Sequence, residues 1–422
     1  MLWQPSLPSR YLELDERTLA ARIEDRRARL GDSLLILGHH YQMDEVVAHA
    51  DFMGDSLKLA QLAAGVVEQR ADAGTPVEHI VFCGVHFMAE TADILTPDSV
   101  GVILPDLSAG CSMADMADYD QTVDAWELIH KALHAQGWTG RVIPITYVNS
   151  TAAIKAFVGE HGGACCTSSN AGQVFEWAIS GGTTPREPGE DIKILFLPDQ
   201  HLGRNTAAAH GIDTETGTCV YDPVLTDKGE PLGGAEPEEI LRSDVILWAG
   251  HCSVHKLFRP EHAAEIHKAN AELPPGEEPT RIIVHPECCK EVVDLADQSG
   301  STEFIIKTLE AAQPGTRWAV GTEVHLVNRL KNRLAERGVE VTMLSDCQCL
   351  CTTMFRIDPP HMLWVLDGLC GIGTAKDAAF DDEGGDPVAR NVVAVHPEAQ
   401  RLAMLALERM LAHTGGGAVK SA

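Results

Sequence analysis

Short runs of consecutive apolar residues recur along this chain and predict buried β-strands. Val245–Trp248 is one of them, and a continuous apolar run with branched side chains is typical of a parallel strand covered on both faces. The other runs are Leu34–Gly38, Ile80–Gly84, one that starts at Val100, Val142–Val148, Ile192–Leu197, Ile282–His285, Trp318–Gly321 and one that starts at Val339. Segments with helical spacing separate many of these runs, which predicts an α/β fold.

The predicted strands fall into three groups of three, and the third strand of each group leads to cysteine. The first group leads to Cys111, the second to Cys252, and the third to the segment CQCLC that ends at Cys351. We therefore predict one unit used three times, as three similar three-layer α/β/α domains related by pseudo-threefold symmetry, with the active site at their common interface. The predicted boundaries are 1–112, 113–255 and 256–355, followed by C-terminal helices and a flexible tail at 356–422.

Composition narrows the class of protein. The chain has 422 residues, 45% of them hydrophobic, and a formal net charge of −28. Such a charge opposes non-specific binding to nucleic acid or to an anionic membrane, so we expect neither partner. No apolar run approaches the roughly 18 residues of a membrane span, and the first residues lack the pattern of a signal peptide. We expect a cytoplasmic protein.

The connectors at 113–138 and 206–237 carry no readable motif, and 206–237 is expected to be irregular.

Cysteine usage points to metal chemistry. Twelve cysteines exceed what packing needs, and a reducing compartment disfavours a disulfide framework. Cys347, Cys349 and Cys351 could form a local zinc or redox site, but CxCxC is a tight spacing for one tetrahedral ion. The alternative takes one cysteine from each unit. Three thiolates suit three irons of a 4Fe-4S cluster and leave the fourth iron open as a Lewis acid.

Polar residues stand at several predicted strand ends, where open α/β sheets bind ligands. They include His39 and Tyr41 after the first strand, and Tyr147 and Asn149 in the second unit. In the third unit, HPE places His285 and Glu287 on alternate positions. That pair could transfer protons, and a capped, solvated pair is the alternative.

Hydroxyl-rich helix starts recur as GDS, NST, TSSN and GST. Free backbone amides and hydroxyls at a helix start favour anions, so together these segments predict a cradle for carboxylate and phosphate. For Ser56 alone, a helix cap is the alternative interpretation.

Several motifs together resemble the quinolinate synthase family, the A protein of the bacterial NAD pathway. These motifs are HHYQMDEVVAHADFMGDSL, LPDLSAGCSMAD, YVNSTAAIK, CTSSNA, GHCSVH, VHPECCKEVVDLAD, GSTEFI and VGTEVHL, which span about residues 34 to 355. The resemblance implies condensation of iminoaspartate with dihydroxyacetone phosphate to quinolinate, with release of phosphate and water, in de novo NAD biosynthesis. It also implies one 4Fe-4S cluster per chain, held by three cysteines, with iminoaspartate supplied by L-aspartate oxidase or aspartate dehydrogenase.

The resemblance also implies functions for particular residues. The cluster ligands would be Cys111, Cys252 and Cys351, with Cys349 and Cys347 as alternatives to Cys351. A methionine follows the family's third ligand, and Met354 in Cys351-Thr-Thr-Met354 fits that pattern. The catalytic residues would be Tyr41, His39, Glu287, His285 and Tyr147. The substrate-binding residues would be His39, Ser56, Tyr147, Asn149, Ser168, His255, His285, Glu287, Ser301 and Thr302. Two other classes remain open: another three-cysteine iron-sulfur enzyme, such as the reductase of isoprenoid synthesis or a diphthamide enzyme, and a non-catalytic iron-sulfur redox sensor.

Overall fold

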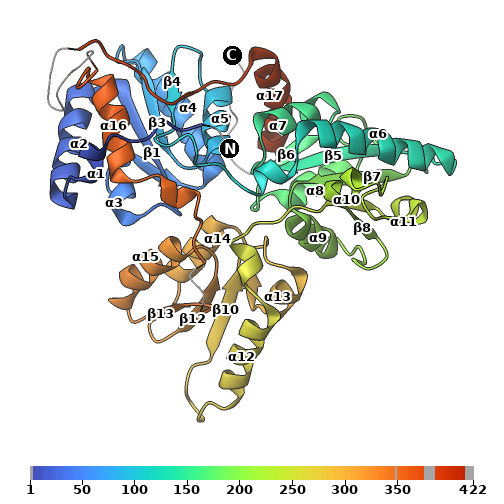
Figure 1. Ribbon diagram of the computed structural model, residues 1–422. Coiled ribbons are helices and arrows are strands. Elements are labelled where there is room, and N and C mark those ends of the chain that lie inside the picture. Colours follow the sequence, from blue (N-terminus) through green and yellow to red (C-terminus); the bar gives the residue numbers. More distant parts are fainter. Residues whose placement is uncertain (1–2, 347–348, 375–384, 414–422) are drawn as a thin grey trace. The chain divides into compact units, whose positions relative to one another are not determined.

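The computed structural model describes residues 3–346, 349–374 and 385–413. Within these residues the strands form three separate sheets, built from successive parts of the chain (Figure 1). Helices separate most consecutive strands, so the predicted α/β class is confirmed. Among the described helices, none combines the length and the apolar character needed to cross a membrane.

The first sheet has the order β2-β1-β3-β4-β14. Its strands are β1 (Leu34–His39), β2 (Phe52–Gly54), β3 (His79–Cys83), β4 (Gly101–Ile103) and β14 (Val392–Val393). The first four are parallel, and β14 from the C-terminal part of the chain pairs antiparallel with β4. The first predicted group of three strands is therefore present as β1, β3 and β4.

The second and third sheets are parallel throughout. The second, in the order β6-β5-β7-β9-β8, contains β5 (Arg141–Tyr147), β6 (Ala164–Cys166), β7 (Ile192–Leu197), β8 (Thr218–Tyr221) and β9 (Val245–Trp248). The third, in the order β11-β10-β12-β13, contains β10 (Thr280–Val284), β11 (Gln298–Ser299), β12 (Arg317–Gly321) and β13 (Glu340–Met343). Both remaining groups of predicted strands are thus confirmed.

The three sheets share one strand order. In each, the first strand lies between the second and the third, and a later strand lies beyond the third. A common order is what a repeated unit predicts, although the pseudo-threefold relation between the units stays a prediction. Parallel order also brings the carboxyl ends of the strands to one edge of each sheet, which is where ligands bind in such sheets.

Some strands were not predicted from the hydrophobic pattern. The short strands β2, β6 and β11 have three, three and two residues, too few to show a periodic pattern. Each pairs with the first strand of its sheet. In addition, β8 lies within the connector 206–237, so the prediction that this connector is irregular is wrong there.

Helices cover the sheets. They are α1 (Ser9–Leu12), α2 (Glu16–Leu30), α3 (Asp44–Val47), α4 (Ser56–Asp72), α5 (His86–Leu95), α6 (Tyr119–Ala135), α7 (Ala152–Glu160), α8 (Ala171–Ile179), α9 (Gln200–Ala209), α10 (Pro223–Asp227), α11 (Pro237–Arg242), α12 (Pro260–Ala271), α13 (Lys290–Leu295), α14 (Thr302–Glu310), α15 (Val324–Ala335), α16 (Pro359–Leu369) and α17 (Pro397–Ala412). Four 3₁₀ turns, η1 (Gly31–Ser33), η2 (Ala114–Met116), η3 (His255–Leu257) and η4 (Met354–Arg356), complete the described elements.

The chain divides into two compact units. One consists of residues 1–111 and 350–396, and the other of residues 112–349 and 397–422. The C-terminal part contributes to both, because α16 packs against α2 in the first unit while α17 packs against α7 and β6 in the second. The predicted boundaries at 112, 255 and 355 separate the parallel strands of the three sheets along the chain, and as domain boundaries they stay a prediction.

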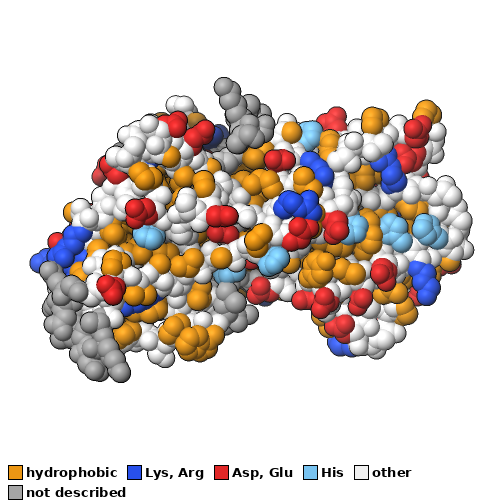
Figure 2. Space-filling model, turned by 90° about the horizontal axis from the view of Figure 1, so that it is seen from above, with side chains coloured by type: hydrophobic (Ala, Val, Ile, Leu, Met, Phe, Trp, Pro, Cys, Tyr) orange, Lys and Arg blue, Asp and Glu red, His pale blue; other side chains and the backbone are white. Residues whose placement is uncertain are grey.

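The cores form around the central strands. All residues of β1, β7 and β9 are buried, which agrees with apolar runs covered on both faces. At the surface, acidic side chains lie in many places among apolar and basic ones on the face drawn in Figure 2. The acidity of the chain is therefore dispersed over this face.

A buried ion pair joins the leading helix to α16 in the first unit. The fully buried Asp367 carboxylate accepts hydrogen bonds from Arg26 Nε at 2.8 Å and from the Tyr11 hydroxyl at 2.9 Å. Asp367→Ala is expected to lower the free energy of unfolding by about 3 kcal/mol, because it removes the buried partner of the Arg26 charge. Thermal or urea unfolding measures this loss.

Asp25→Ala serves as the control for that prediction. Asp25 also contacts Arg26, at 2.7 Å, but its side chain is 46% exposed. Its removal is expected to lower the free energy of unfolding far less than removal of Asp367 does. Equal losses for the two variants would contradict the importance assigned to the buried pair.

Candidate functional site

The turns that follow β9 and β10 bring His255 and Glu287 into direct contact. His255 Nδ1 lies 2.8 Å from Glu287 Oε2, and both side chains are almost completely buried. Both residues belong to the compact unit that contains residues 112–349. The predicted binding residue His255 is therefore the immediate partner of the predicted catalytic residue Glu287.

His285 and Tyr147 complete this cluster. The His285 ring stacks on His255 with ring centroids 4.6 Å apart, and His285 Nδ1 lies 3.7 Å from Glu287 Oε1. Tyr147, the last residue of β5, donates a hydrogen bond from its hydroxyl to Glu287. Four predicted site residues thus meet at the carboxyl ends of three strands. The alternative of a solvated HPE pair is excluded, because His285 and Glu287 are 2% and 3% exposed.

The cluster has a defined charge state at neutral pH. Burial opposes ionisation of Glu287, but the adjacent His255 and His285 rings and the hydrogen bonds from His255 and Tyr147 hold the pKa of Glu287 below its usual value. Burial lowers the pKa of His285 to about 3. Glu287 is therefore a carboxylate and His285 a neutral imidazole, and the shorter contact of Glu287 is with His255, at 2.8 Å, rather than with His285, at 3.7 Å.

Two further buried polar residues, Thr322 and Asp199, adjoin the cluster and were missed from the sequence. Thr322 Oγ1 lies 3.2 Å from His255 Nε2. Burial, and then the negative charge of Glu287, raise the pKa of the fully buried Asp199 well above its ordinary value. Both residues lie within two positions of the end of the third strand of a sheet, Thr322 after β12 and Asp199 after β7. The strand-end rule that selected Tyr147 could have identified them.

The three predicted cluster cysteines begin turns with the same local structure. A 3₁₀ turn starts three residues after Cys111, Cys252 and Cys351, as η2, η3 and η4. In each turn the carbonyl two residues after the cysteine accepts the N–H of the residue three positions further on. Each cysteine is half-buried and each following residue is exposed. Cys349 does not fit this pattern and is fully buried, while Cys347 lies outside the described residues.

Donor atoms gather around Cys252. Its Sγ, a ring nitrogen of His255 and a carboxylate oxygen of Glu287 lie within 4.8 Å of one another. Thiolate, imidazole and carboxylate are all metal ligands. The half-buried Cys252 thiol and the neighbouring imidazole and carboxylate therefore fit a metal group as donors.

Side-chain hydrogen bonds within each unit hold the segments next to Cys111, Cys252 and Cys351. In one unit, the Trp248 indole N–H donates to the Met116 carbonyl at 2.6 Å, which joins the turn after Cys111 to the strand before Cys252. In the other unit, Arg356 Nη1 donates to Ser108 Oγ at 2.9 Å, which joins the residues after Cys351 to the loop before Cys111. The Cys111 loop is thus anchored on both sides.

The end of β1 carries His39 and Tyr41, the predicted catalytic residues of the other unit. The Tyr41 backbone N–H donates to His39 Nδ1 at 3.1 Å, and the two rings meet edge to face with centroids 4.8 Å apart. This bond leaves the His39 proton on Nε2 when the ring is neutral. The structure therefore keeps His39 and Tyr41 together at the predicted strand end.

Three of the four hydroxyl-rich helix starts, GDS, TSSN and GST, occupy equivalent places in the three sheets. Ser56, Ser168 and Ser301 each follow the short second strand, β2, β6 or β11. Ser56 does not cap α4, because Asp55 accepts the Lys58 N–H at 2.9 Å. Ser301 does cap α14 through the Phe304 N–H at 3.3 Å, and Thr302 is the first residue of that helix. Asn149 is half-buried in the turn after β5.

Comparison with known proteins identifies the family. A family model described as quinolinate synthetase A protein matches residues 21–412. This chain belongs to the quinolinate synthase family. The resemblance predicted from the sequence motifs is therefore confirmed.

Curated quinolinate synthases match this chain over nearly its whole length. The protein of Acidobacterium capsulatum is 48% identical over 403 residues, which cover 95% of this chain and 94% of the relative. That of Bacillus velezensis is 47% identical over 413 residues, 97% of this chain and 96% of the relative. That of a Nocardioides species is 49% identical over 399 residues, 94% of this chain and 90% of the relative.

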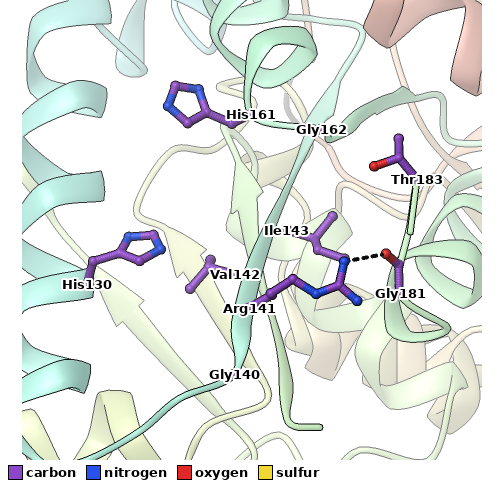
Figure 3. Close-up of a pocket in the computed structure, with 9 residues that line it drawn as sticks. All are labelled: His130, Gly140, Arg141, Val142, Ile143, His161, Gly162, Gly181 and Thr183. Carbon is purple, nitrogen blue, oxygen red and sulfur yellow. Dashed lines mark hydrogen bonds between the residues drawn. The ribbon is translucent and has the colours of Figure 1, made fainter. Parts of the chain in front are cut away.

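The pocket drawn in Figure 3 lies elsewhere on this quinolinate synthase family member. It measures about 180 Å³ and is lined by His130, Gly140, Arg141, Val142, Ile143, His161, Gly162, Gly181 and Thr183. It lies at the amino end of β5, whereas Tyr147 is at the carboxyl end. Arg141 pairs with Glu190 and donates to the Gly181 carbonyl at 3.1 Å, so its charge is already compensated. We therefore place the candidate site at the carboxyl ends and not in this pocket.

Proposed function

We propose that this protein condenses iminoaspartate with dihydroxyacetone phosphate to form quinolinate, with release of phosphate and water, in de novo NAD biosynthesis. The observation that carries the proposal is the buried contact of His255, Glu287 and Tyr147 beside Cys252. Condensation followed by dehydration needs two kinds of group close together: side chains that transfer protons, and a group that polarises a leaving hydroxyl. Membership of the quinolinate synthase family supports the same chemistry.

In this proposal Cys111, Cys252 and Cys351 hold one 4Fe-4S cluster. Support comes from the shared turn structure of the three cysteines, which favours Cys351 over Cys349 as the third ligand. With three protein thiolates, such a cluster supplies Lewis-acid chemistry at its remaining iron. We also propose that the protein acts in the cytoplasm, where a reducing environment keeps thiols available.

The protein's own residues then bind and convert the substrates. Ser56, Ser168, Ser301 and Thr302, with the amides of their helix starts, hold the carboxylates and the phosphate. Tyr147 and Asn149 orient the substrate. Tyr41 and His39 move protons during isomerisation and formation of the carbon–carbon bond.

Glu287 serves the dehydrations together with its histidines. Its carboxylate holds the Nδ1 proton of His255, so that Nε2 is the ring nitrogen that exchanges a proton with the substrate. Neutral His285 stacks against His255 and limits the movement of its ring. Iminoaspartate would come from L-aspartate oxidase or aspartate dehydrogenase, because both enzymes convert aspartate to the imine.

Anaerobic purification followed by an assay for quinolinate tests the proposal. We expect quinolinate to form only when both iminoaspartate and dihydroxyacetone phosphate are supplied, and phosphate to appear in equal amount. Iron and sulfide in the same preparation should correspond to one 4Fe-4S cluster per chain. A loaded cluster without quinolinate formation would favour another three-cysteine iron-sulfur enzyme or a redox sensor.

A further inference from the structure

Asn205 on α9 binds the backbone on both sides of Glu287. Its side-chain Nδ2 donates to the Pro286 carbonyl at 2.8 Å and to the Cys288 carbonyl at 2.9 Å. A single amide group therefore uses both of its N–H donors on the two residues that flank the carboxylate. Asn205 is half-buried and belongs to none of the motifs singled out in the sequence.

The helix that carries Asn205 is itself firmly placed. Asp199 caps α9 by accepting the N–H groups of His201 and Leu202 at 2.7 and 2.9 Å. The helix also packs against α13, which follows the HPECC turn. Helix α9 packs on strands of the second sheet, and through Asn205 it holds the turn that follows β10 of the third sheet.

We propose that Asn205 is a positioning residue for Glu287, an inference that rests on the proton-transfer function proposed above. The two hydrogen bonds fix the carbonyls on either side of Glu287 and so fix the path of its backbone. That path sets the 2.8 Å contact between Glu287 Oε2 and His255 Nδ1. Proton transfer depends steeply on such a distance, and a displacement of about 1 Å can cost on the order of 10² in rate.

Asn205→Asp is the sharpest test, because aspartate has the shape of asparagine but cannot donate to either carbonyl. In the anaerobically prepared holoenzyme we expect kcat to fall by about tenfold or more. The KM values for both substrates, the iron content and the melting temperature should stay close to those of the control variant.

Asn270→Asp is the matched control. Asn270, on α12, donates from Nδ2 to the Thr280 carbonyl at 2.8 Å, at the amino end of the strand whose carboxyl end leads to Glu287. The same chemical change therefore removes a similar side-chain-to-backbone bond on β10, far along the strand from Glu287. Its kcat is expected to equal that of the unmodified protein.

A double variant separates action through Glu287 from a general structural effect. If Asn205 acts only by positioning Glu287, Asn205→Asp should cost no further turnover when Glu287 is already replaced by glutamine. Additive losses would overturn the inference, and so would an Asn205→Asp protein with the kcat of the control. If Asn205→Asp does not fold, Asn205→Ala is measured in the same way and judged by the same outcomes. Full turnover of Glu287→Gln alone would instead contradict the proposed function of Glu287.

Discussion

Replacing Cys111, Cys252 or Cys351 by serine is expected to prevent stable assembly of the cluster in an otherwise folded protein. With three protein thiolates for four irons, losing one leaves a second iron without a protein ligand. The three cysteines are half-buried at turn starts, so serine is expected to be tolerated by the fold. Iron and sulfide per chain after anaerobic reconstitution should fall well below one cluster, while circular dichroism stays unchanged.

Cys289→Ser is the matched control, since Cys289 is also half-buried and also precedes a helix but lacks the 3₁₀ turn that follows the three predicted ligands. It should bind a full cluster. We expect Cys165, Cys166 and Cys288 to be dispensable for the cluster as well, because burial raises the pKa of each thiol and opposes its conversion to a thiolate ligand.

The turn structure favours Cys351 over Cys349 as the third ligand, and this choice can be tested separately. A Cys351→Ser protein with a full cluster would transfer the third ligand to Cys349 or Cys347. Full loading of all three single variants would instead contradict a cluster held by one cysteine from each turn. Both results are read from the same iron and sulfide analysis.

Glu287→Gln is expected to reduce turnover by a factor on the order of 10² or more, within the usual range for acid–base catalysis. Glutamine keeps the shape of the side chain and an oxygen that can accept from Tyr147, but it cannot stabilise a proton on His255. The rate should therefore fall far more than the melting temperature or the iron content. Steady-state assays for quinolinate, thermal unfolding and iron analysis measure the three quantities.

Glu323→Gln provides the comparison for that variant. Glu323 is also fully buried, follows the strand β12, and contacts a histidine, with its Oε1 3.0 Å from His325 Nδ1. Its carboxylate caps α15 by accepting the His325 N–H, a structural function. Turnover of Glu323→Gln is expected to stay near that of the unmodified protein. If the two glutamine variants lose activity equally, the specific importance of the Glu287 charge is refuted.

The pattern of apolar residues in the sequence predicted most of the strands and failed for the shortest ones. All nine predicted runs contain a strand, although only one residue of β13 is buried. The strands β2, β6 and β11 were missed because their two or three residues are not part of a longer apolar run, as the three residues of β4 are. For the same reason, the equivalence of Ser56, Ser168 and Ser301 became apparent only with the strand order.

The partners inside the candidate site depended on the tertiary structure. The HPE motif suggested that His285 works with Glu287, yet His255 lies closer, 32 residues away along the chain. Thr322 contacts His255 across 67 residues and Asn205 reaches Pro286 across 81. Sequence position alone contained no sign of these pairs.

The sequence by itself determined the α/β class, the threefold recurrence of strands that lead to cysteine, and the family. These properties follow from local apolar runs and from motifs read along the chain. Only the tertiary structure decided which side chains face one another, which charge state Glu287 takes, and that Cys351 begins the same turn as Cys111 and Cys252. The physical reason is that such contacts depend on strand order, register and burial, which bring distant residues within hydrogen-bond distance and are not encoded in any single local segment.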